Sequence, residues 1–110
     1  MEGKVQCDSI SFEEFYAQYP NDTIILPKTV GVDGTLVHQL ILTSIIDLLA
    51  KLVAFIGKKV ADTKETKGTV TMKYQDGFSI EIPLAEFKHS DKVMEKVNEA
   101  HSVYLQTLVD

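Results

Sequence analysis

Residues 35–61 read TLVHQLILTSIIDLLAKLVAFIGKKVA, an unusually apolar stretch for a chain of this size. Written on a helix of 3.6 residues per turn, its large apolar side chains cover about half of the circumference. A surface helix needs an apolar arc of only about 100°. The pattern therefore predicts one long helix from Thr35 to Ala61, which several other elements must cover. Small and polar residues form its opposite strip, among them Asp47, Ala50, Lys51 and Ala54.

The same stretch also approaches the roughly 20 residues that a helix needs to cross a bilayer. Asp47 and Lys51 lie near its middle, where each charge costs about 3 kcal/mol on insertion scales. Their i,i+4 spacing, with the acid first, suits an ion pair on a solvent-facing strip. A core helix of a globular domain is therefore favoured over a membrane span.

Composition and charge describe an ordinary globular domain, which we expect to span residues 1–110. The chain is 45% hydrophobic and 25% charged, its net charge is −5, and every positive side chain is a lysine. Arginine is the usual residue for bidentate contacts to phosphate and guanine, so this acidic chain is poorly suited to nucleic acid. Its one cysteine, Cys7, fits a reducing compartment, and residues 1–20 lack the apolar run of a signal peptide. We therefore expect a cytoplasmic protein.

A short helix is predicted near the start of the chain. Ser11 and Glu14 have the spacing of a capping box, in which the carboxylate reaches back to the N-cap backbone. Ile10 and Phe15 have the spacing of the accompanying hydrophobic staple. These signals predict a helix over Phe12–Tyr19.

Two strands flank that helix in the sequence. Lys4–Cys7 is a possible short strand, and Thr23–Leu26 is rich in β-branched residues. Pro27 is expected to stop the second strand because proline has no N–H to donate to a ladder. Lys28–Gly34 then reads as a connector.

Residues 69–82 predict a β-hairpin around the turn Gln75-Asp76-Gly77. A two-residue Asp-Gly loop would place polar side chains opposite apolar ones. A three-residue loop with Gly77 at positive φ instead makes one face wholly apolar, with three cross-strand pairs: Tyr74 with Phe78, Met72 with Ile80, and Val70 with Ile82. The second register is favoured because a slip by one residue would expose the whole apolar set.

After the hairpin, Leu84–Phe87 is predicted to form one helical turn, and Lys92–Val109 an amphipathic helix. The expected order is α-β-α-β-β-α. The predicted fold class is α+β, a small single domain whose short antiparallel sheet packs on one long central helix.

Residues that could carry chemistry are few. His38, His89 and His101 lie far apart, and no pair has the spacing of a zinc site. Cys7 has no neighbour in sequence that would lower its thiol pKa, and nucleophile motifs such as Gly-x-Ser-x-Gly are missing from the sequence. We therefore expect no enzyme, and no catalytic, metal-binding or cofactor-binding residues.

The expected function is a protein-binding module, of adaptor, chaperone or inhibitor type, that acts as a homodimer. A helix of roughly 27 residues would be about 40 Å long, against a diameter of about 35 Å for a compact domain of this length. Part of its apolar arc, including Val37 and Ile41, would then stay exposed, and a two-fold dimer commonly covers such a surface. The candidate partner-binding residues are Asp47, Lys51, Ala50, Ala54 and Phe55.

Two alternatives stay open. An acidic inhibitor, phage-encoded for example, would occupy the basic groove of a nucleic-acid-handling enzyme and use the carboxylates of Glu86, Asp91, Glu95 and Glu99. A small-ligand-binding protein would need a pocket, which the sequence does not reveal. The sequence also leaves open which surface and which partner are involved.

Overall fold

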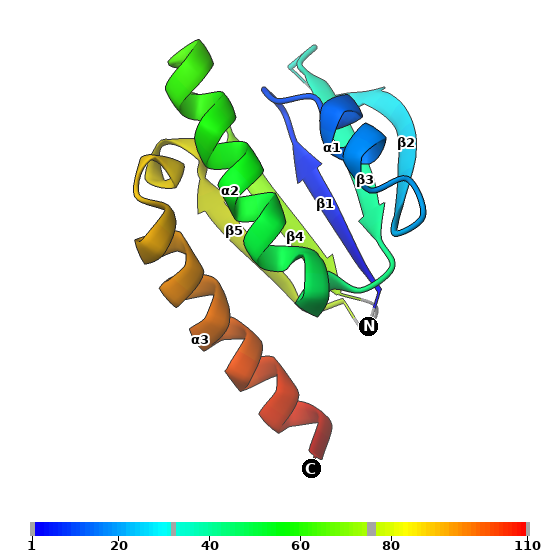
Figure 1. The fold of residues 1–110 in the computed structure, drawn as a ribbon, viewed down its shortest axis with the longest axis vertical. Coiled ribbons are helices and arrows are strands. Elements are labelled where there is room, and N and C mark those ends of the chain that lie inside the picture. The colour runs from blue at the N-terminus through cyan, green and yellow to red at the C-terminus, as the bar shows by residue number, and fades with distance from the viewer. Residues whose placement is uncertain (1, 32, 75–76, 110) are drawn as a thin grey trace.

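Antiparallel strands form one sheet in the order β2-β3-β1-β4-β5, seen in a computed structural model that describes residues 2–31, 33–74 and 77–109 (Figure 1). Three α-helices and a short 3₁₀ helix complete the described part of the chain. The elements, in chain order, are β1 (Gly3–Cys7), α1 (Glu13–Gln18), β2 (Thr23–Val30), β3 (Leu36–Leu42), α2 (Ile45–Thr63), β4 (Thr69–Tyr74), β5 (Ser79–Pro83), η1 (Leu84–Lys88) and α3 (Ser90–Val109).

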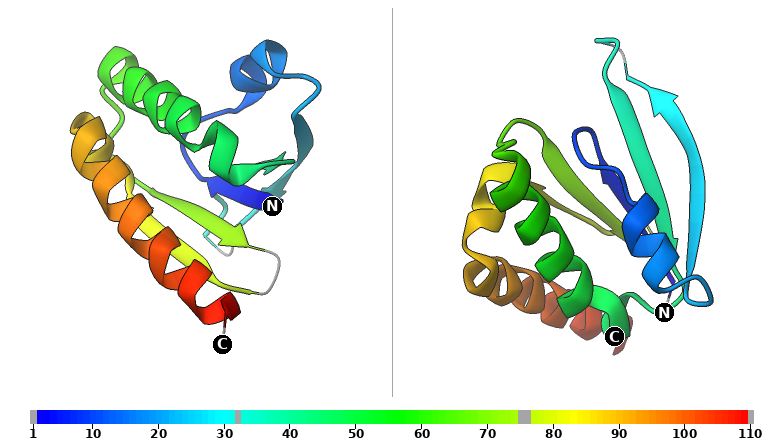
Figure 2. Two further views of the ribbon diagram at one scale, coloured as in Figure 1. Left: turned by 60° about the horizontal axis from the view of Figure 1, so that its bottom comes forward. Right: turned by 45° about the horizontal axis from the view of Figure 1, so that its top comes forward.

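The helices lie on one face of the sheet, and the core lies between the two layers (Figure 2). Side chains alternate along the strands, so that every second residue faces the helices. This face includes Val5, Leu40, Met72 and Ile82, all fully buried against core residues of the helices such as Phe15, Leu52 and Phe87. The α+β class is therefore confirmed, and the possible strand Lys4–Cys7 is present as β1. The expected order α-β-α-β-β-α is incomplete, because it omits β1 and β3.

The predicted long helix is wrong in its first third. Leu36–Leu42 forms strand β3 between β2 and β1, and the helix α2 begins only at Ile45. The apolar residues in this segment fit both a helical and a strand period. Tertiary contacts with other elements therefore decide whether the segment forms a helix or a strand. Pairing with β2 and β1 satisfies the backbone of β3 on both sides, and it sets Leu40 and Leu42 on the sheet face that packs against the helices, where both are fully buried.

The start of α2 has a sequence signal of its own. Ser44 is the N-cap: its Oγ accepts a hydrogen bond from the Asp47 backbone N–H (3.4 Å) and donates one to the Asp47 carboxylate (3.0 Å). The sequence has the Ser-x-x-Asp pattern of a capping box, and here the carboxylate accepts from the Ser44 hydroxyl instead of from the Ser44 backbone N–H. Asp47 therefore serves the helix start, and it forms no ion pair with Lys51 among the described residues.

The shorter helix removes one argument for self-association. Its 19 residues span about 28 Å at 1.5 Å per residue, whereas the long axis of the described chain is 41 Å. The helix therefore does not project beyond the fold. Among the described residues, no helix combines the length and apolar character needed to cross a bilayer.

Strand β2 continues past Pro27, contrary to the prediction. The pairing with β3 shifts by one residue between Leu26 and Thr29 and then resumes, so Pro27 and Lys28 form a bulge opposite His38. Proline is tolerated there because β2 is an edge strand, whose outward N–H groups have no ladder partner. The predicted connector shrinks to the turn between Val30 and Leu36.

The hairpin register is confirmed. Val70 lies opposite Ile82 and Met72 opposite Ile80, and the Tyr74 backbone N–H donates to the Phe78 carbonyl (2.8 Å). Gly77 has a φ of +93°, as the three-residue turn requires. The other two residues of the predicted turn, Gln75 and Asp76, lie outside the described residues.

The capping box predicted for the first helix is not formed. Ser11 Oγ accepts from the Glu13 backbone N–H (3.3 Å), and the helix begins at Glu13. The Glu14 carboxylate instead pairs with Lys59 Nζ at 2.7 Å, which ties α1 to α2. Ile10 and Phe15 are both buried, so the apolar part of the predicted signal contributes to the core.

Candidate functional site

The five residues predicted to bind a partner lie together on α2. Asp47, Ala50, Lys51 and Ala54 are exposed on its outward face, and Phe55 is half-buried. Lys51 Nζ lies 4.9 Å from the centre of the Tyr19 ring, and the ring of Phe55 lies 5.4 Å from that of Phe15. Several of these side chains therefore already have contacts within the chain. Their binding of a partner stays a prediction.

A more apolar surface lies on the sheet face opposite the helices. The β2–β3 register places Ile24 opposite Ile41 and Leu26 opposite Gln39 on this open face. Val37, two residues before Gln39 on β3, faces the same side. We call Ile24, Leu26, Val37 and Ile41 the open-face patch. Ile24 is 50% exposed and the other three are partly exposed.

The open face changes character across the sheet. Across the strands, Ile24 and Ile41 are followed on the open face by Lys4 on β1 and Lys73 on β4. The neighbouring line of paired residues ends at Glu81 on β5. The β2–β3 half is therefore apolar and the β4–β5 half polar. At the tip of the β2–β3 hairpin, Val30 (69%) and Leu36 (49%) are also exposed, but alternation along β3 places this pair on the side of His38 and Leu40, opposite the patch.

The two sheet edges are less suited to pairing with another chain. β2 carries Pro27, Lys28 and the bulge, and β5 is a short strand that carries Glu81 and ends at Pro83. Proline, charge, bulges and short length are the devices by which proteins prevent edge-to-edge association. A contact through the open face is therefore more plausible than one through an edge.

A cleft of about 420 Å³ lies where α1 meets the β2–β3 strands. Ser11, Glu13, Lys28 and His38 supply its polar lining, and apolar lining comes from Phe12, Ile25 and Pro27. The sequence analysis missed this site because it placed His38 on a helix, far from Glu13 and Lys28. The bulge in β2, which no local pattern in the sequence indicates, is what sets Lys28 beside His38.

His38 is held towards its neutral form in this cleft. Partial burial lowers its pKa most, the nearby Lys28 ammonium lowers it further, and the Glu13 carboxylate acts in the opposite direction. A neutral imidazole has one hydrogen-bond donor and one acceptor. The cleft therefore combines an acid, an ammonium and a neutral polar ring beside apolar walls.

The other candidate chemical groups are less accessible. Cys7 lies opposite His38 in the β1–β3 ladder, but burial raises the pKa of its thiol, so the reactive thiolate is disfavoured. His101 Nδ1 lies 3.2 Å from the Tyr74 hydroxyl, within hydrogen-bond distance. In the described part of the chain, no three residues among His, Cys, Asp and Glu are grouped as a metal ion would require.

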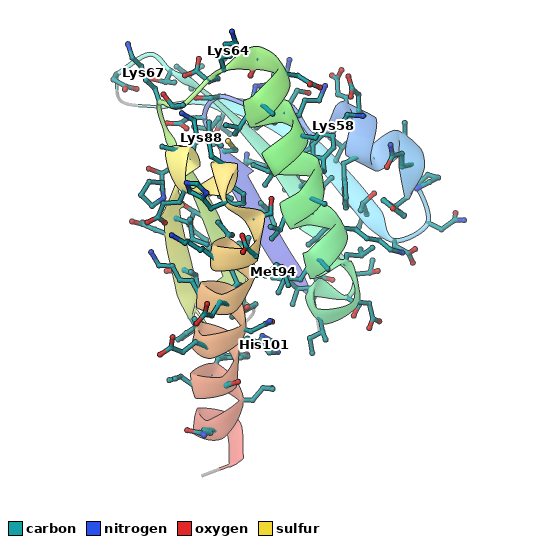
Figure 3. The ribbon with its side chains drawn as sticks, turned by 60° about the vertical axis from the view of Figure 1, so that its left-hand side comes forward. Lys58, Lys64, Lys67, Lys88, Met94 and His101 are labelled. Carbon is teal, nitrogen blue, oxygen red and sulfur yellow. The ribbon has the colours of Figure 1, made fainter. Side chains whose placement is uncertain are left out.

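The acidic residues of η1 and α3 do not form an unbroken negative surface. Glu86 pairs with Lys96 at 3.3 Å. Figure 3 shows Lys58, Lys64, Lys67 and Lys88 towards the end of the molecule where α2 ends and α3 begins. These positive charges dilute the feature on which an acidic inhibitor would depend.

Comparison with known proteins gives no family for this chain: no family model matches it, and neither the curated proteins nor the solved structures include a significant match. The functional interpretation therefore depends on the surfaces and the cleft described above.

Proposed function

We propose that this chain is a non-enzymatic protein-binding module that acts as a homodimer, with the open-face patch as the contact between two copies. The observation that carries the proposal is the apolar half of a sheet face that the described helices leave uncovered. Burial of apolar area is the main driving force of protein association. The non-enzymatic part rests on the sequence, which lacks nucleophile and metal-site motifs.

A second copy of the chain suits this patch because the patch is self-complementary. A two-fold axis through it would set apolar side chains against apolar side chains, and would leave the polar β4–β5 half at the rim. The patch holds only four apolar side chains. A stable interface buries about 800 Å² per partner, so we expect a dimer that dissociates on dilution in the micromolar range.

Two matched substitutions separate the open-face patch from the α2 surface. Ile24 on β2 and Ile46 on α2 are both 50% exposed, so a lysine at either position costs the fold little. Multi-angle light scattering over a dilution series should give the wild type a mass approaching twice 12.3 kDa at high concentration. Ile24→Lys should reduce the mass to that of one chain, and Ile46→Lys should leave the dimer unchanged.

Each other result has a definite meaning. A wild-type mass near 12.3 kDa at every concentration would refute the homodimer. Loss of the dimer in Ile46→Lys but not in Ile24→Lys would refute the open-face patch and favour the α2 residues Asp47, Ala50, Lys51, Ala54 and Phe55. Ile25→Lys is a further control, because Ile25 is the next residue on the same strand and faces the opposite side of the sheet.

A further inference from the structure

The cleft beside α1 has the size of a small-molecule site. Its volume of about 420 Å³ falls within the range of about 300–1,000 Å³ that is typical of ligand pockets. It is also built from three separate elements: the start of α1, the bulge of β2 and the middle of β3. Bulges are common next to binding sites, because they redirect side chains that a regular strand would point elsewhere.

The cleft has two opposite charges that are not neutralised by other side chains. Glu13 and Lys28 both line it and both influence the His38 ring. Among the described residues, neither Glu13 nor Lys28 takes part in an ion pair, and they do not pair with each other. The site is thus neutral in sum but offers one carboxylate and one ammonium at separate points.

The remaining lining is largely apolar. Phe12, which is almost fully buried, Ile25 and Pro27 contribute to the wall. An apolar group placed against them would be removed from water without displacing any of the charges. His38, whose pKa is lowered by partial burial, adds ring nitrogens that form hydrogen bonds between the polar and apolar parts.

We propose that this cleft binds a small zwitterion with an apolar body, of the class of the apolar α-amino acids. The ligand ammonium pairs with Glu13, the ligand carboxylate pairs with Lys28, and the apolar side chain lies on Phe12, Ile25 and Pro27. A simple anion would be repelled by Glu13 and a simple cation by Lys28. Only a ligand with both charges satisfies the two groups at once.

The test is a titration of the ¹⁵N-labelled full chain with leucine, followed by amide NMR shifts. Because so small a ligand has few atoms with which to bind, the titration extends to about 20 mM. Shifts should concentrate at the residues of the cleft. Acetylation of the leucine amine, or conversion of its carboxylate to an amide, should each weaken binding at least tenfold.

Substitutions in the protein should match those changes in the ligand. Lys28→Gln and Glu13→Gln should each weaken leucine binding at least tenfold, whereas the exposed controls Lys88→Gln and Glu81→Gln should leave it unchanged. The absence of shifts in the wild type would overturn the proposal. Equal binding of leucine and its acetylated form, or unchanged binding in Lys28→Gln, would overturn it as well. Light scattering of the same samples reports the homodimer separately, so failure of one proposal does not imply failure of the other.

Discussion

Gly68 is the position where a single added methyl group should disturb the fold most clearly. Its φ is +105°, and a Cβ built there would collide with the side chains of Asp8 and Ser9. Those side chains hold the segment before β4: the Thr69 backbone N–H donates to Asp8 Oδ1 (3.1 Å), and Ser9 Oγ donates to the Lys67 carbonyl (2.8 Å). Gly68→Ala must therefore adopt an unfavourable φ and also displace a capping side chain.

The magnitude follows from these two contributions. A positive φ costs an L-residue about 1–2 kcal/mol, and loss of a hydrogen bond to a charged acceptor costs about 1.5–3 kcal/mol. Gly77→Ala is the matched control, because Gly77 has a similar φ of +93° but no atom within 4 Å of the added Cβ. The effect of alanine on the unfolded chain is common to both variants and cancels in their difference.

Urea unfolding followed by circular dichroism measures both variants. We expect Gly68→Ala to lower the free energy of unfolding by about 2 kcal/mol more than Gly77→Ala does, because the hydrogen bond is lost only at Gly68. In a thermal melt, this corresponds to a difference in Tm of about 8 °C for a chain of this length. Equal destabilisation of the two variants would show that Asp8 and Ser9 do not constrain Gly68, and would refute the reasoning.

Three further outcomes test the local structure. Tyr74→Phe removes the hydroxyl that meets His101 Nδ1, so it should lower the free energy of unfolding by about 1–2 kcal/mol in urea; a neutral effect would mean that this hydrogen bond is not formed. Ser44→Ala should cost about 1 kcal/mol in the same assay, whereas Ser44→Thr, which keeps the hydroxyl that bonds Asp47, should cost much less. The pKa of His38 in the folded chain lies below its ordinary value. As the pH falls, the unfolded chain therefore takes up a proton at this residue before the folded chain does. The contribution of His38 to the free energy of unfolding is therefore complete above about pH 6.5, and it is lost as the pH decreases through the folded pKa. In His38→Gln, this part of the pH dependence of stability should disappear.

The parts of the fold that could be predicted from sequence are those set by local pattern. The register of the β4–β5 hairpin follows from side-chain alternation and one glycine, because any other pairing mixes polar and apolar faces. The helices η1 and α3 follow from Pro83 and from the apolar stripe of the last segment. Ser44 and Asp47 also carry a helix-start signal, but the apolar run extends across it on both sides and so favours a longer helix.

The candidate sites depended on contacts between distant segments. Glu13, Lys28 and His38 come from three elements, and only the packing of α1 on the sheet together with the bulge at Pro27 brings them to one cleft. The open-face patch likewise exists only because β2 and β3 pair in a register that aligns Ile24 with Ile41. Side-chain type alone could not reveal either arrangement.

By itself the sequence determined the α+β class, the hairpin register and the C-terminal helices, since each depends on periodicity within a few neighbouring residues. Only the tertiary structure decided the state of Leu36–Leu42. Its leucines and isoleucine suit a helix as well as a strand, and the choice depends on which partners bury them and complete the backbone hydrogen bonds. In this fold, β1, about 35 residues earlier in the chain, and β2 complete the backbone hydrogen bonds, and Leu40 and Leu42 are buried in the core on the helix-facing side of the sheet. The long-range pairing therefore overrides the local pattern.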